Sequence, residues 1–572
     1  MLKNMSVFRA FIILVLLSYP FSGAAAGNDA VVGKSGMVVS VDEYASQVGI
    51  EILKKGGNAV DAAVAVGFAL AVTYPSAGNI GGGGFMIIRF PDTKEVVALD
   101  FREMAPGRAS ADMYLDDEGE YIKGKSLYGY LAVGVPGTVK GFELAMEKYG
   151  SLNWEDVIGP AVKLADKGFK LTKKRADSFN WLKKRFKHGT EEFFHIFSKP
   201  DESEFKEGDI FINKDLAKSL RLIAKHGSDT FYKGQIAESI ALDMKKHGGL
   251  ITKEDLGSYE AFIRKPVTGT HHGYQIISMP PPSSGGTILI EMLNILEGYN
   301  LGQRERYAPE TLHLIAETMK FAYFDRAKYM GDTDFVEVPV ELLTSKGHAE
   351  EIREKIDPKK AIPSRKIGKE ILTLEKAKDT THFSVIDKKG LAVATTYTLN
   401  GGFGAGVVAE GTGILLNNEM DDFNVTPGYT NNKGLIGTKP NLIEPHKRML
   451  SSMSPTIICK DGKVFMITGS PGGRTIINTV LNVILNVIDF NMPIQDAVDA
   501  PRMDHEWMPD RLRLEREGLS NNVIEALRAM GHTIGRSRSW EQGDAHSILI
   551  DPETGLYYGA ADKRSEGSAI GY

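Results

Sequence analysis

Apolar residues at helical spacing follow the first apolar stretch of the chain. Ser40-Val41-Asp42-Glu43 has the spacing of a capping box and predicts the start of a helix, which Gly56-Gly57 ends. Asn58 is placed to cap a second helix from Ala59 to Val72. Because this second segment has very few polar residues, we predict that the helix is buried.

A glycine run separates these helices from two predicted strands. Gly81-Gly82-Gly83-Gly84 ends the helical pattern, and Phe85 to Phe90 and Glu95 to Phe101 have the composition of paired strands. Four glycines also fit a phosphate-binding loop, but no Gly-Lys-Ser/Thr follows them, so a tight turn with close backbone approach is the better interpretation. The second strand ends at Arg102-Glu103, which fits either a ligand-binding arginine or a surface ion pair.

The middle of the chain is mainly helical and amphipathic. The helices predicted there are Trp154 to Lys167, Lys214 to His226, Gln235 to His247 and Pro309 to Tyr329. A rigid loop, Met279 to Gly286, interrupts them. The basic residues between 173 and 187 are interpreted as a solvated helix face rather than a membrane-binding patch.

Strand signals dominate after a basic, poorly periodic linker at residues 357–378. The predicted strands are Thr381 to Ile386, Leu391 to Thr398, Gly413 to Asn417, Pro455 to Cys459 and Val464 to Thr468, and a buried helix covers Val480 to Ile488. If Asp387-Lys388-Lys389-Gly390 is the turn of a hairpin, Ile386 pairs with Leu391. Thr380 then faces Tyr397 and lies beside Thr398.

Composition places the chain among large globular proteins. Its 572 residues are 42% hydrophobic, enough for several domains or one large α/β unit. The net charge of -5, from 68 basic and 73 acidic residues, gives no indication of a nucleic-acid partner. Cys459 is the single cysteine, so an intramolecular disulfide is excluded, and we expect its side chain to be a buried small hydrophobe.

The N-terminus has the layout of a secretory signal. Lys3 and Arg9 precede an apolar run that ends near Phe21, and the small residues Ala24-Ala25-Ala26 follow. We predict cleavage after Ala26 and export of the mature protein. An uncleaved anchor is the alternative, but the apolar run is short for a bilayer span.

The candidate chemistry begins at Thr380, where two adjacent hydroxyl side chains open a predicted strand. A threonine hydroxyl is a poor nucleophile without a base, and His382 is the nearest side chain that could serve. A cut between Asp379 and Thr380 would instead expose a threonine α-amine, whose reference pKa of about 7.7 to 8.0 suits a base at neutral pH. A plain threonine-rich hairpin is the competing interpretation.

Three segments farther along carry candidate site groups. Asn417 to Phe423 follows a strand and fits a solvated loop, a cation site or a pocket for an ammonium group, although the spacing of a calcium loop is absent. Ser451-Ser452 precedes the next strand. Gly469 to Gly473 leads into a helix, where backbone N–H groups could stabilise an oxyanion.

Together these motifs resemble the γ-glutamyltranspeptidase family of N-terminal-nucleophile hydrolases. The resemblance covers nearly all of the chain after the signal segment and rests on seven segments in order: Gly57 to Ala63, Asp100 to Glu103, Pro280 to Gly286, Thr380 to Ser384, Asn417 to Phe423, Ser451 to Thr456 and Gly469 to Gly473. It implies a four-layer αββα sandwich. It also implies a signal peptide at 1–26, a large subunit at 27–379 and a small subunit at 380–572, intertwined as one unit.

The resemblance also implies roles for the site residues. Thr380 would first attack the carbonyl of Asp379 and so cut the chain. It would later attack the γ-carbonyl of glutathione or a related γ-glutamyl compound to form an acyl-enzyme. Water, an amino acid or a dipeptide would then accept the γ-glutamyl group from Thr380. The supporting residues are Thr398 to orient Thr380, Gly472 and Gly473 for the oxyanion, Arg102, Ser451 and Ser452 for the α-carboxylate, and Asn400, Glu419 and Asp422 for the α-ammonium. His382 becomes structural.

The same resemblance implies a lid from Phe423 to Met449, with Tyr429 as a candidate gate, no cofactor and no metal. The protein is expected to be periplasmic or secreted, without a stable membrane anchor once the signal is removed. Two alternatives stay open. One is a cephalosporin or glutaryl acylase of the same fold, and the other is a non-catalytic exported binding protein for glutamyl compounds.

Overall fold

The structure is a computed structural model that describes residues 30–187, 189–368, 380–428, 437–515, 517, 519–536 and 542–572. The predicted signal segment 1–26, the cleavage residue Asp379 and the candidate gate Tyr429 lie outside these residues. Among the helices that the structure describes, none is long and apolar enough to cross a membrane.

One seven-stranded antiparallel sheet contains the strand that begins at Thr380. Strand β10 (Thr380–Asp387) lies in its middle, between β2 (Gly36–Ser40) and β11 (Ala392–Thr398). The order is β21-β2-β10-β11-β3-β4-β7, in which the outer strands are β21 (Ser568–Gly571), β3 (Gly83–Arg89), β4 (Val96–Phe101) and β7 (Phe262–Arg264).

A second seven-stranded antiparallel sheet stacks on the first. Its order is β1-β20-β19-β15-β14-β9-β8, with strands β1 (Val31–Gly33), β20 (Tyr557–Ala561), β19 (His546–Ile550), β15 (Lys463–Thr468), β14 (Thr456–Lys460), β9 (Tyr274–Ser278) and β8 (Val267–His271). A buried apolar cluster that draws on both sheets fills the space between them, with Phe85 and Ile87 from the first sheet and Ile457 and Ile467 from the second.

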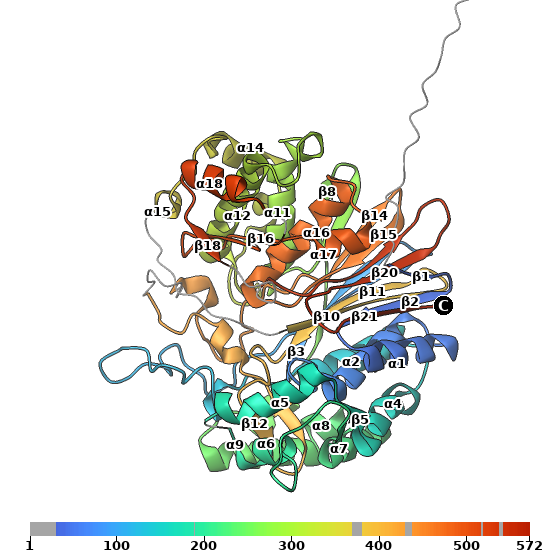
Figure 1. The fold of residues 1–572 in the computed structure, drawn as a ribbon. Helices are drawn as coiled ribbons and strands as arrows, with labels where there is room; N and C mark the ends of the chain where they lie inside the picture. The colour runs from blue at the N-terminus through green and yellow to red at the C-terminus, as the bar shows by residue number, and fades with distance from the viewer. Residues whose placement is uncertain are drawn as a thin grey trace, which may run out of the picture.

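Helices cover the outer face of each sheet (Figure 1). Helices α1 (Glu43–Lys54), α2 (Ala59–Thr73), α3 (Thr138–Tyr149) and α4 (Trp154–Lys167) share a core with the first sheet. Helices α11 (Gly285–Glu297), α12 (Pro309–Tyr329), α16 (Ile476–Ile488) and α17 (Ile494–Asp499) share a core with the second. The layers therefore run helix, sheet, sheet, helix, and the predicted αββα sandwich is confirmed.

Further elements decorate these layers. On the side of the first sheet they are β5 (Phe169–Lys170), α5 (Lys173–Arg185), α6 (Glu191–Ile196), β6 (Ile210–Phe211), α7 (Lys214–His226), α8 (Asp229–Tyr232), α9 (Gln235–His247), α10 (Lys253–Gly257), β12 (Val407–Ala409) and β13 (Ile414–Leu416). On the side of the second they are α13 (Val340–Leu343), α14 (Lys346–Lys355), α15 (Ser364–Ile367), β16 (Met503–Asp504), β17 (Leu512–Leu514), α18 (Asn521–Ala529) and β18 (Ile534–Arg536).

The helix predictions match closely, apart from one cap. Helices α4, α7, α9 and α12 have the predicted bounds, and every residue of α2 is buried behind the predicted Asn58 cap. Helix α1 is capped by Asp42 rather than Ser40, because the Asp42 carboxylate accepts the Ala45 N–H at 2.9 Å. Ser40 instead ends strand β2.

The predicted register of the β10–β11 hairpin is wrong by one residue. Ile386 pairs with Ala392 and Thr380 pairs with Thr398. The turn is one residue longer than predicted: Gly390 has a φ of 85°, and the Asp387 carboxylate accepts the N–H groups of Lys389 and Leu391 at 2.8 and 3.2 Å. This loop geometry inserts an extra residue before the ladder begins.

The basic run at 173–187 is only partly a solvated face. Arg175 is 7% exposed, and its guanidinium pairs with the buried carboxylate of Asp42 at the start of α1. This arginine therefore ties α5 to the helical layer, whereas Lys173 and Lys174 remain exposed.

A substitution at Gly67 of α2 tests how tightly the first helical layer is packed. A Cβ added there would lie 2.3 Å from a Phe142 ring atom, so Gly67→Ala should lower the free energy of unfolding by about 1–3 kcal/mol through overpacking. Gly159→Ala in α4 is the matched control, because nothing lies within 4 Å of its added Cβ. It should raise stability by up to about 1 kcal/mol. Urea unfolding of both variants measures this, and equal stabilities would contradict the packing described.

Candidate active site

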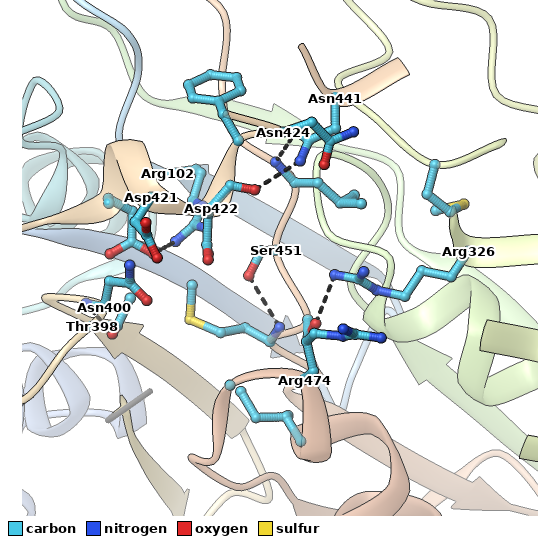
Figure 2. Close-up of a pocket in the computed structure, with 18 of the residues that line it drawn as sticks. Arg102, Arg326, Thr398, Asn400, Asp421, Asp422, Asn424, Asn441, Ser451 and Arg474 are labelled. Atoms are coloured by element: carbon cyan, nitrogen blue, oxygen red, sulfur yellow. Dashed lines mark hydrogen bonds and ion pairs between the residues drawn. The ribbon is translucent and has the colours of Figure 1, made fainter. Parts of the chain in front are cut away.

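A cavity of about 90 Å³ opens at the beginning of β10 and collects most of the predicted site residues (Figure 2). The predicted residues that line it are Thr380, Thr398, Asn400, Arg102, Glu419, Asp422, Ser451, Ser452 and Gly473. Gly472 precedes Gly473 without lining the cavity. Segments from both halves of the chain therefore meet at Thr380.

The hydroxyl of Thr380 faces the hydroxyl of Thr398 across the β10–β11 ladder. The two Oγ1 atoms are 3.3 Å apart, with Thr380 donating. Thr398 Oγ1 also accepts the N–H of Asn400 at 2.7 Å. Because that second bond fixes the Thr398 hydroxyl, it can in turn hold Thr380 Oγ1 in one orientation.

His382 is buried between the two sheets and does not line the cavity. Its ring nitrogens bond to Thr396 Oγ1 at 2.8 Å and Ser384 Oγ at 3.1 Å. Burial, with a contribution from His546, holds the pKa of His382 well below its usual range. A neutral, doubly bonded imidazole suits a structural role, and Gly469 leaves room for the ring.

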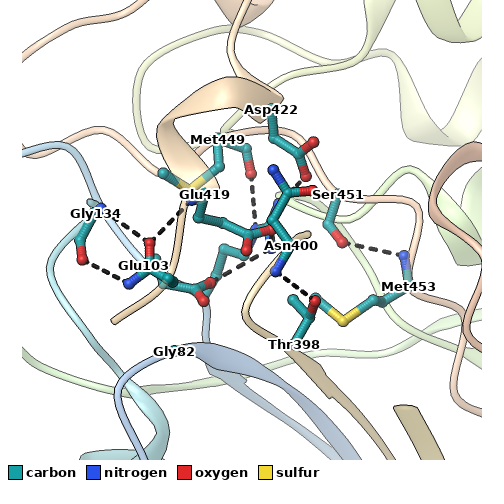
Figure 3. Close-up of polar contacts among 12 residues, drawn as sticks. Gly82, Glu103, Gly134, Thr398, Asn400, Glu419, Asp422, Met449, Ser451 and Met453 are labelled. Carbon is teal, nitrogen blue, oxygen red and sulfur yellow. Dashed lines mark hydrogen bonds and ion pairs between the residues drawn. The ribbon is translucent and has the colours of Figure 1, made fainter. Parts of the chain in front are cut away.

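Arg102 is fully buried and contacts three carboxylates. Figure 3 shows these three side chains, Glu103, Glu419 and Asp422. Its Nη1 pairs with Glu419 Oε1, its Nη2 lies 2.5 Å from Asp422 Oδ2, and its Nε donates to the Met449 carbonyl at 3.2 Å. The interpretation of Arg102 as a surface ion pair is therefore wrong. The interpretation of Asn417 to Phe423 as a solvated loop is wrong too, since Glu419 is 1% exposed.

Glu103 adds a third carboxyl to this group. Its Oε2 is 3.4 Å from Arg102 Nη1, and burial together with the charge of Glu419 raises the pKa of Glu103 well above its usual range. The glycine run makes room here: a Cβ on Gly83 would lie 2.7 Å from Glu103 Oε2, and a Cβ on Gly82 only 2.0 Å from the Thr398 carbonyl. The predicted close backbone approach at these glycines is confirmed.

The loop Met279 to Gly286 forms hydrogen bonds with the segment that carries Ser451 and Ser452. Ser284 donates to the Ser451 carbonyl through its N–H at 2.9 Å and its hydroxyl at 2.7 Å, and the Ser451 N–H donates to the Pro282 carbonyl. Ser452 Oγ accepts from Arg326 at 2.9 Å. In this structure the guanidinium that reaches Ser452 is therefore Arg326, whereas Arg102 pairs with the carboxylates.

Gly472 and Gly473 form the turn that leads into α16. Their φ values of 131° and 58° are strained for residues with a side chain. Thr475 fixes the turn by donating to the Gly472 carbonyl through its hydroxyl at 2.9 Å. Within the described part of the chain, neither glycine N–H has a protein acceptor.

Two lining arginines escaped the sequence analysis, Arg326 on α12 and Arg474 after Gly473 (Figure 2). Burial, and then the charge of Arg474, lowers the pKa of Arg326 to about 10. Arg474 Nη2 donates to the Glu506 carbonyl at 3.0 Å. Arg474 adjoins the glycine motif and could have been suspected, but nothing in the pattern of α12 distinguishes Arg326 from a surface arginine.

Stacked sheets between helical layers, with a threonine at the start of a central strand facing a polar pocket, define an N-terminal-nucleophile hydrolase fold. A family profile described as gamma-glutamyltranspeptidase matches residues 45–572. The chain belongs to the γ-glutamyltranspeptidase family.

Individual relatives agree. A glutathione hydrolase proenzyme of Escherichia coli (strain K12) is 50% identical over 93% of this chain and 91% of its own, and one of Pseudomonas sp. (strain A14) is 45% identical over 100% of both. Among solved structures, a cephalosporin acylase from Bacillus halodurans has a TM-score of 0.82 at 28% identity, covering 98% of this chain and 99% of its own. A Helicobacter pylori gamma-glutamyltranspeptidase chain has a TM-score of 0.55 at 48% identity, covering 56% of this chain and 92% of its own.

Removing the Arg102 charge tests the buried ion-pair group. Arg102→Met should lower the free energy of unfolding by about 3–5 kcal/mol, because Glu419 and Asp422 lose their buried counter-ion. Arg108→Met, in an exposed position, is the control and should change stability by at most about 0.5 kcal/mol. Urea unfolding of the two variants measures the difference. If Arg102→Met costs no more than the control, these contacts do not stabilise the fold.

Proposed function

We propose that the protein is a self-cleaving γ-glutamyl transferase and hydrolase whose nucleophile is Thr380. The observation that carries the proposal is the meeting, in one cavity, of the Thr380 hydroxyl with a buried guanidinium and buried carboxylates. A γ-glutamyl group presents an α-carboxylate, an α-ammonium and a reactive γ-carbonyl. A pocket with both charge signs beside an oriented hydroxyl suits that combination.

Maturation would begin at the peptide bond between Asp379 and Thr380. Thr380 Oγ1 attacks the Asp379 carbonyl and transfers the acyl group from nitrogen to oxygen, which leaves an ester and a free α-amine. Water then hydrolyses the ester, and the products are a large subunit ending at Asp379 and a small subunit from Thr380 to Tyr572. Thr380 starts β10, so the cut would remove no residue from that strand.

The freed α-amine would serve as the base in catalysis. A reference pKa of about 7.7 to 8.0 leaves part of this amine neutral near pH 7, so it can accept the Thr380 hydroxyl proton during attack on the γ-carbonyl. The N–H groups of Gly472 and Gly473 stabilise the oxyanion, and the leaving amine takes the proton. Water or an acceptor amine then attacks the ester and releases the γ-glutamyl product. The nucleophile, the base and the oxyanion donors in this scheme are all groups of the protein.

The glutamyl head would enter the ion pairs that Arg102 makes. The α-carboxylate of the substrate would bind to Arg102, Ser451 and Ser452. Its α-ammonium would bind to Glu419, Asp422 and Asn400. Support comes from Asn400 Oδ1, which is buried and has no hydrogen-bond partner among the described residues. A zwitterionic head has no net charge, so it leaves the net charge of the pocket unchanged while it offers an anion to Arg102 and a cation to Glu419 and Asp422.

Glutathione is the first donor to test, because the relatives from Escherichia coli and Pseudomonas sp. are named glutathione hydrolase proenzymes. Amino acids and dipeptides are the proposed acceptors. We also propose export to the periplasm or the medium, on the basis of the N-terminal segment.

An acylase is the second candidate, because an acylase ACY 1 proenzyme of Pseudomonas sp. (strain V22) is 37% identical over 94% of both chains. The buried carboxylates beside Arg102 favour the γ-glutamyl group, since a glutaryl side chain carries no ammonium to meet them. A non-catalytic binding protein would need no oriented hydroxyl, and it predicts an uncut chain.

Thr380→Ala should abolish both self-cleavage and activity. Denaturing electrophoresis of the wild type should show a fragment of about 21 kDa, the 193-residue share (380–572) of a 62.6 kDa chain of 572 residues. The variant should stay one band and lose activity by on the order of 10⁴-fold or more.

Thr381→Ala is the matched control, because it removes the same hydroxyl one residue later, on the opposite face of β10. It should still be cut and should keep most of the activity. A Thr380→Ala protein that still divides at this position would overturn self-cleavage by Thr380.

Substrate choice separates the two enzymatic candidates. The kcat/KM for a γ-glutamyl anilide should exceed that for a glutaryl anilide by at least about a hundredfold, because the glutaryl group leaves buried carboxylates unpaired. Asp422→Asn should narrow this ratio, since it weakens the ammonium contact. A wild type that prefers the glutaryl substrate would make the protein an acylase.

A further inference from the structure

Glu291 is the buried acid that the catalytic account leaves unexplained. It lies on α11, its side chain is fully buried, and neither carboxylate oxygen has a hydrogen-bond partner in the described part of the chain. Burying a carboxyl without hydrogen bonds costs free energy in either protonation state. Among the described residues, His348 Nε2 approaches one of these oxygens at 3.7 Å, an ion-pair distance that is longer than a hydrogen bond.

Two further metal-binding side chains converge on Glu291. His348 of α14 places Nε2 at 3.7 Å from Glu291 Oε1 and 2.8 Å from Asp325 Oδ2, and Asp325 comes from α12. One ligand atom from each residue lies within 4.8 Å of the other two. Three helices of the outer layer on the second sheet thus bring two carboxylates and one imidazole to a single point.

The separations suit a shared metal ion. Nitrogen and oxygen ligands about 2.1 Å from a tetrahedral ion lie about 3.4 Å from one another. The 3.7 Å between Glu291 and His348 is close to that value, whereas the 2.8 Å contact between His348 and Asp325 is a hydrogen bond that would lengthen when both atoms bind the ion. Two carboxylates and a neutral imidazole also carry the charge that one divalent cation balances. The donor set of two oxygens and one nitrogen is typical of first-row transition metals and zinc.

A metal-free alternative is a protonated Glu291 beside a His348–Asp325 ion pair. Burial raises the pKa of Glu291 to about 8, and contacts with Asp325 and Glu291 raise the pKa of His348 to about 10. In that state the Glu291 hydroxyl would turn toward the Asp325 carboxylate, and the second Glu291 oxygen would still have no hydrogen-bond partner among the described residues. A bound cation explains both the unpartnered oxygens and the convergence of the three side chains.

We propose that Glu291, Asp325 and His348 bind one divalent transition-metal ion, Zn²⁺ more tightly than Mn²⁺, with a remaining position open to water. The preference follows the general affinity order of nitrogen and oxygen sites. His348 is the most exposed of the three side chains, at 14%, and offers access from solvent.

The ion would link helices α11 and α12 next to the catalytic cavity. Asp325 directly precedes Arg326, which lines the cavity and donates to Ser284 and Ser452 at 2.8 and 2.9 Å. Ser284 is in turn the residue that caps the helix of Glu291. Joining α11 to α12 here would therefore steady Arg326 without any contact between metal and substrate.

Equilibrium dialysis of the chelator-treated, purified protein against Zn²⁺, and separately against Mn²⁺, tests the site by metal analysis. The wild type should retain one equivalent of Zn²⁺, and Glu291→Gln should bind it at least about a hundredfold more weakly. Glu297→Gln, on the same helix and bonded to Lys346 and His272, is the matched control and should retain the equivalent. His272→Ala should also retain it, which separates this site from the neighbouring group of His271, His272 and Asp489.

Thermal unfolding gives a readout that is independent of activity. Saturating Zn²⁺ should raise the Tm of the wild type and of Glu297→Gln but not that of Glu291→Gln. Metal-free Glu291→Gln should fold normally, because glutamine matches the neutral acid in shape. A wild type that retains no Zn²⁺, an equivalent that survives Glu291→Gln, or one that is lost with His272→Ala would each overturn the proposal.

Discussion

The ladder between β10 and β11 is the constraint on which the site depends. It pairs Thr380 with Thr398 and continues to Ile386, so strand β11 already holds β10 at its first residue. On the other side, β2 pairs with β10 only from Ser384 onward. Thr380 is thus fixed along its β11 edge, and it lines the cavity together with its partner Thr398. A strand held in this way can keep its place whether or not a peptide bond precedes it.

The second constraint is electrostatic. Arg102 is buried with Glu419, Asp422 and Glu103, a group that carries more acid than base. Burial and the charge of Glu419 raise the pKa of Glu103, which favours its neutral form and so relieves part of that excess. Under the proposed function, the guanidinium and its carboxylate partners would exchange these ion pairs for contacts with a zwitterionic ligand. Such a pocket selects for a ligand with both charges, because a ligand with only one would leave a buried charge without its counter-ion.

Local signals in the sequence predict the elements well and the long-range contacts poorly. Helices α4, α7, α9 and α12 follow from their apolar spacing, and the burial of α2 follows from its composition. The predicted hairpin register was wrong by one residue because the length of the turn depends on the backbone conformation at Gly390. Composition does not determine that conformation. The predicted N-cap of α1 was wrong because Ser40 and Asp42 are both residue types that cap helices well. Which of them caps α1 depends on where strand β2 ends.

The candidate site divides in the same way. Thr380 and Gly473 lie within motifs that carry the resemblance, and the resemblance also implies a role for Thr398, so the position of these three residues at the cavity could be predicted. Arg326 could not, because only the packing of α12 against the loop from Met279 to Gly286 turns its guanidinium toward Ser284 and Ser452. The pairing of Arg102 with two carboxylates was equally hidden, since Glu419 and Asp422 lie more than three hundred residues away in the chain.

In the proposed mature protein, Thr380 is the first residue of a separate chain. N-terminal sequencing of the small fragment from purified wild-type protein tests it most directly. The account predicts a sequence that begins Thr-Thr-His-Phe, from Thr380 to Phe383. A chain that remains intact, or a fragment that begins at any other residue, would contradict it.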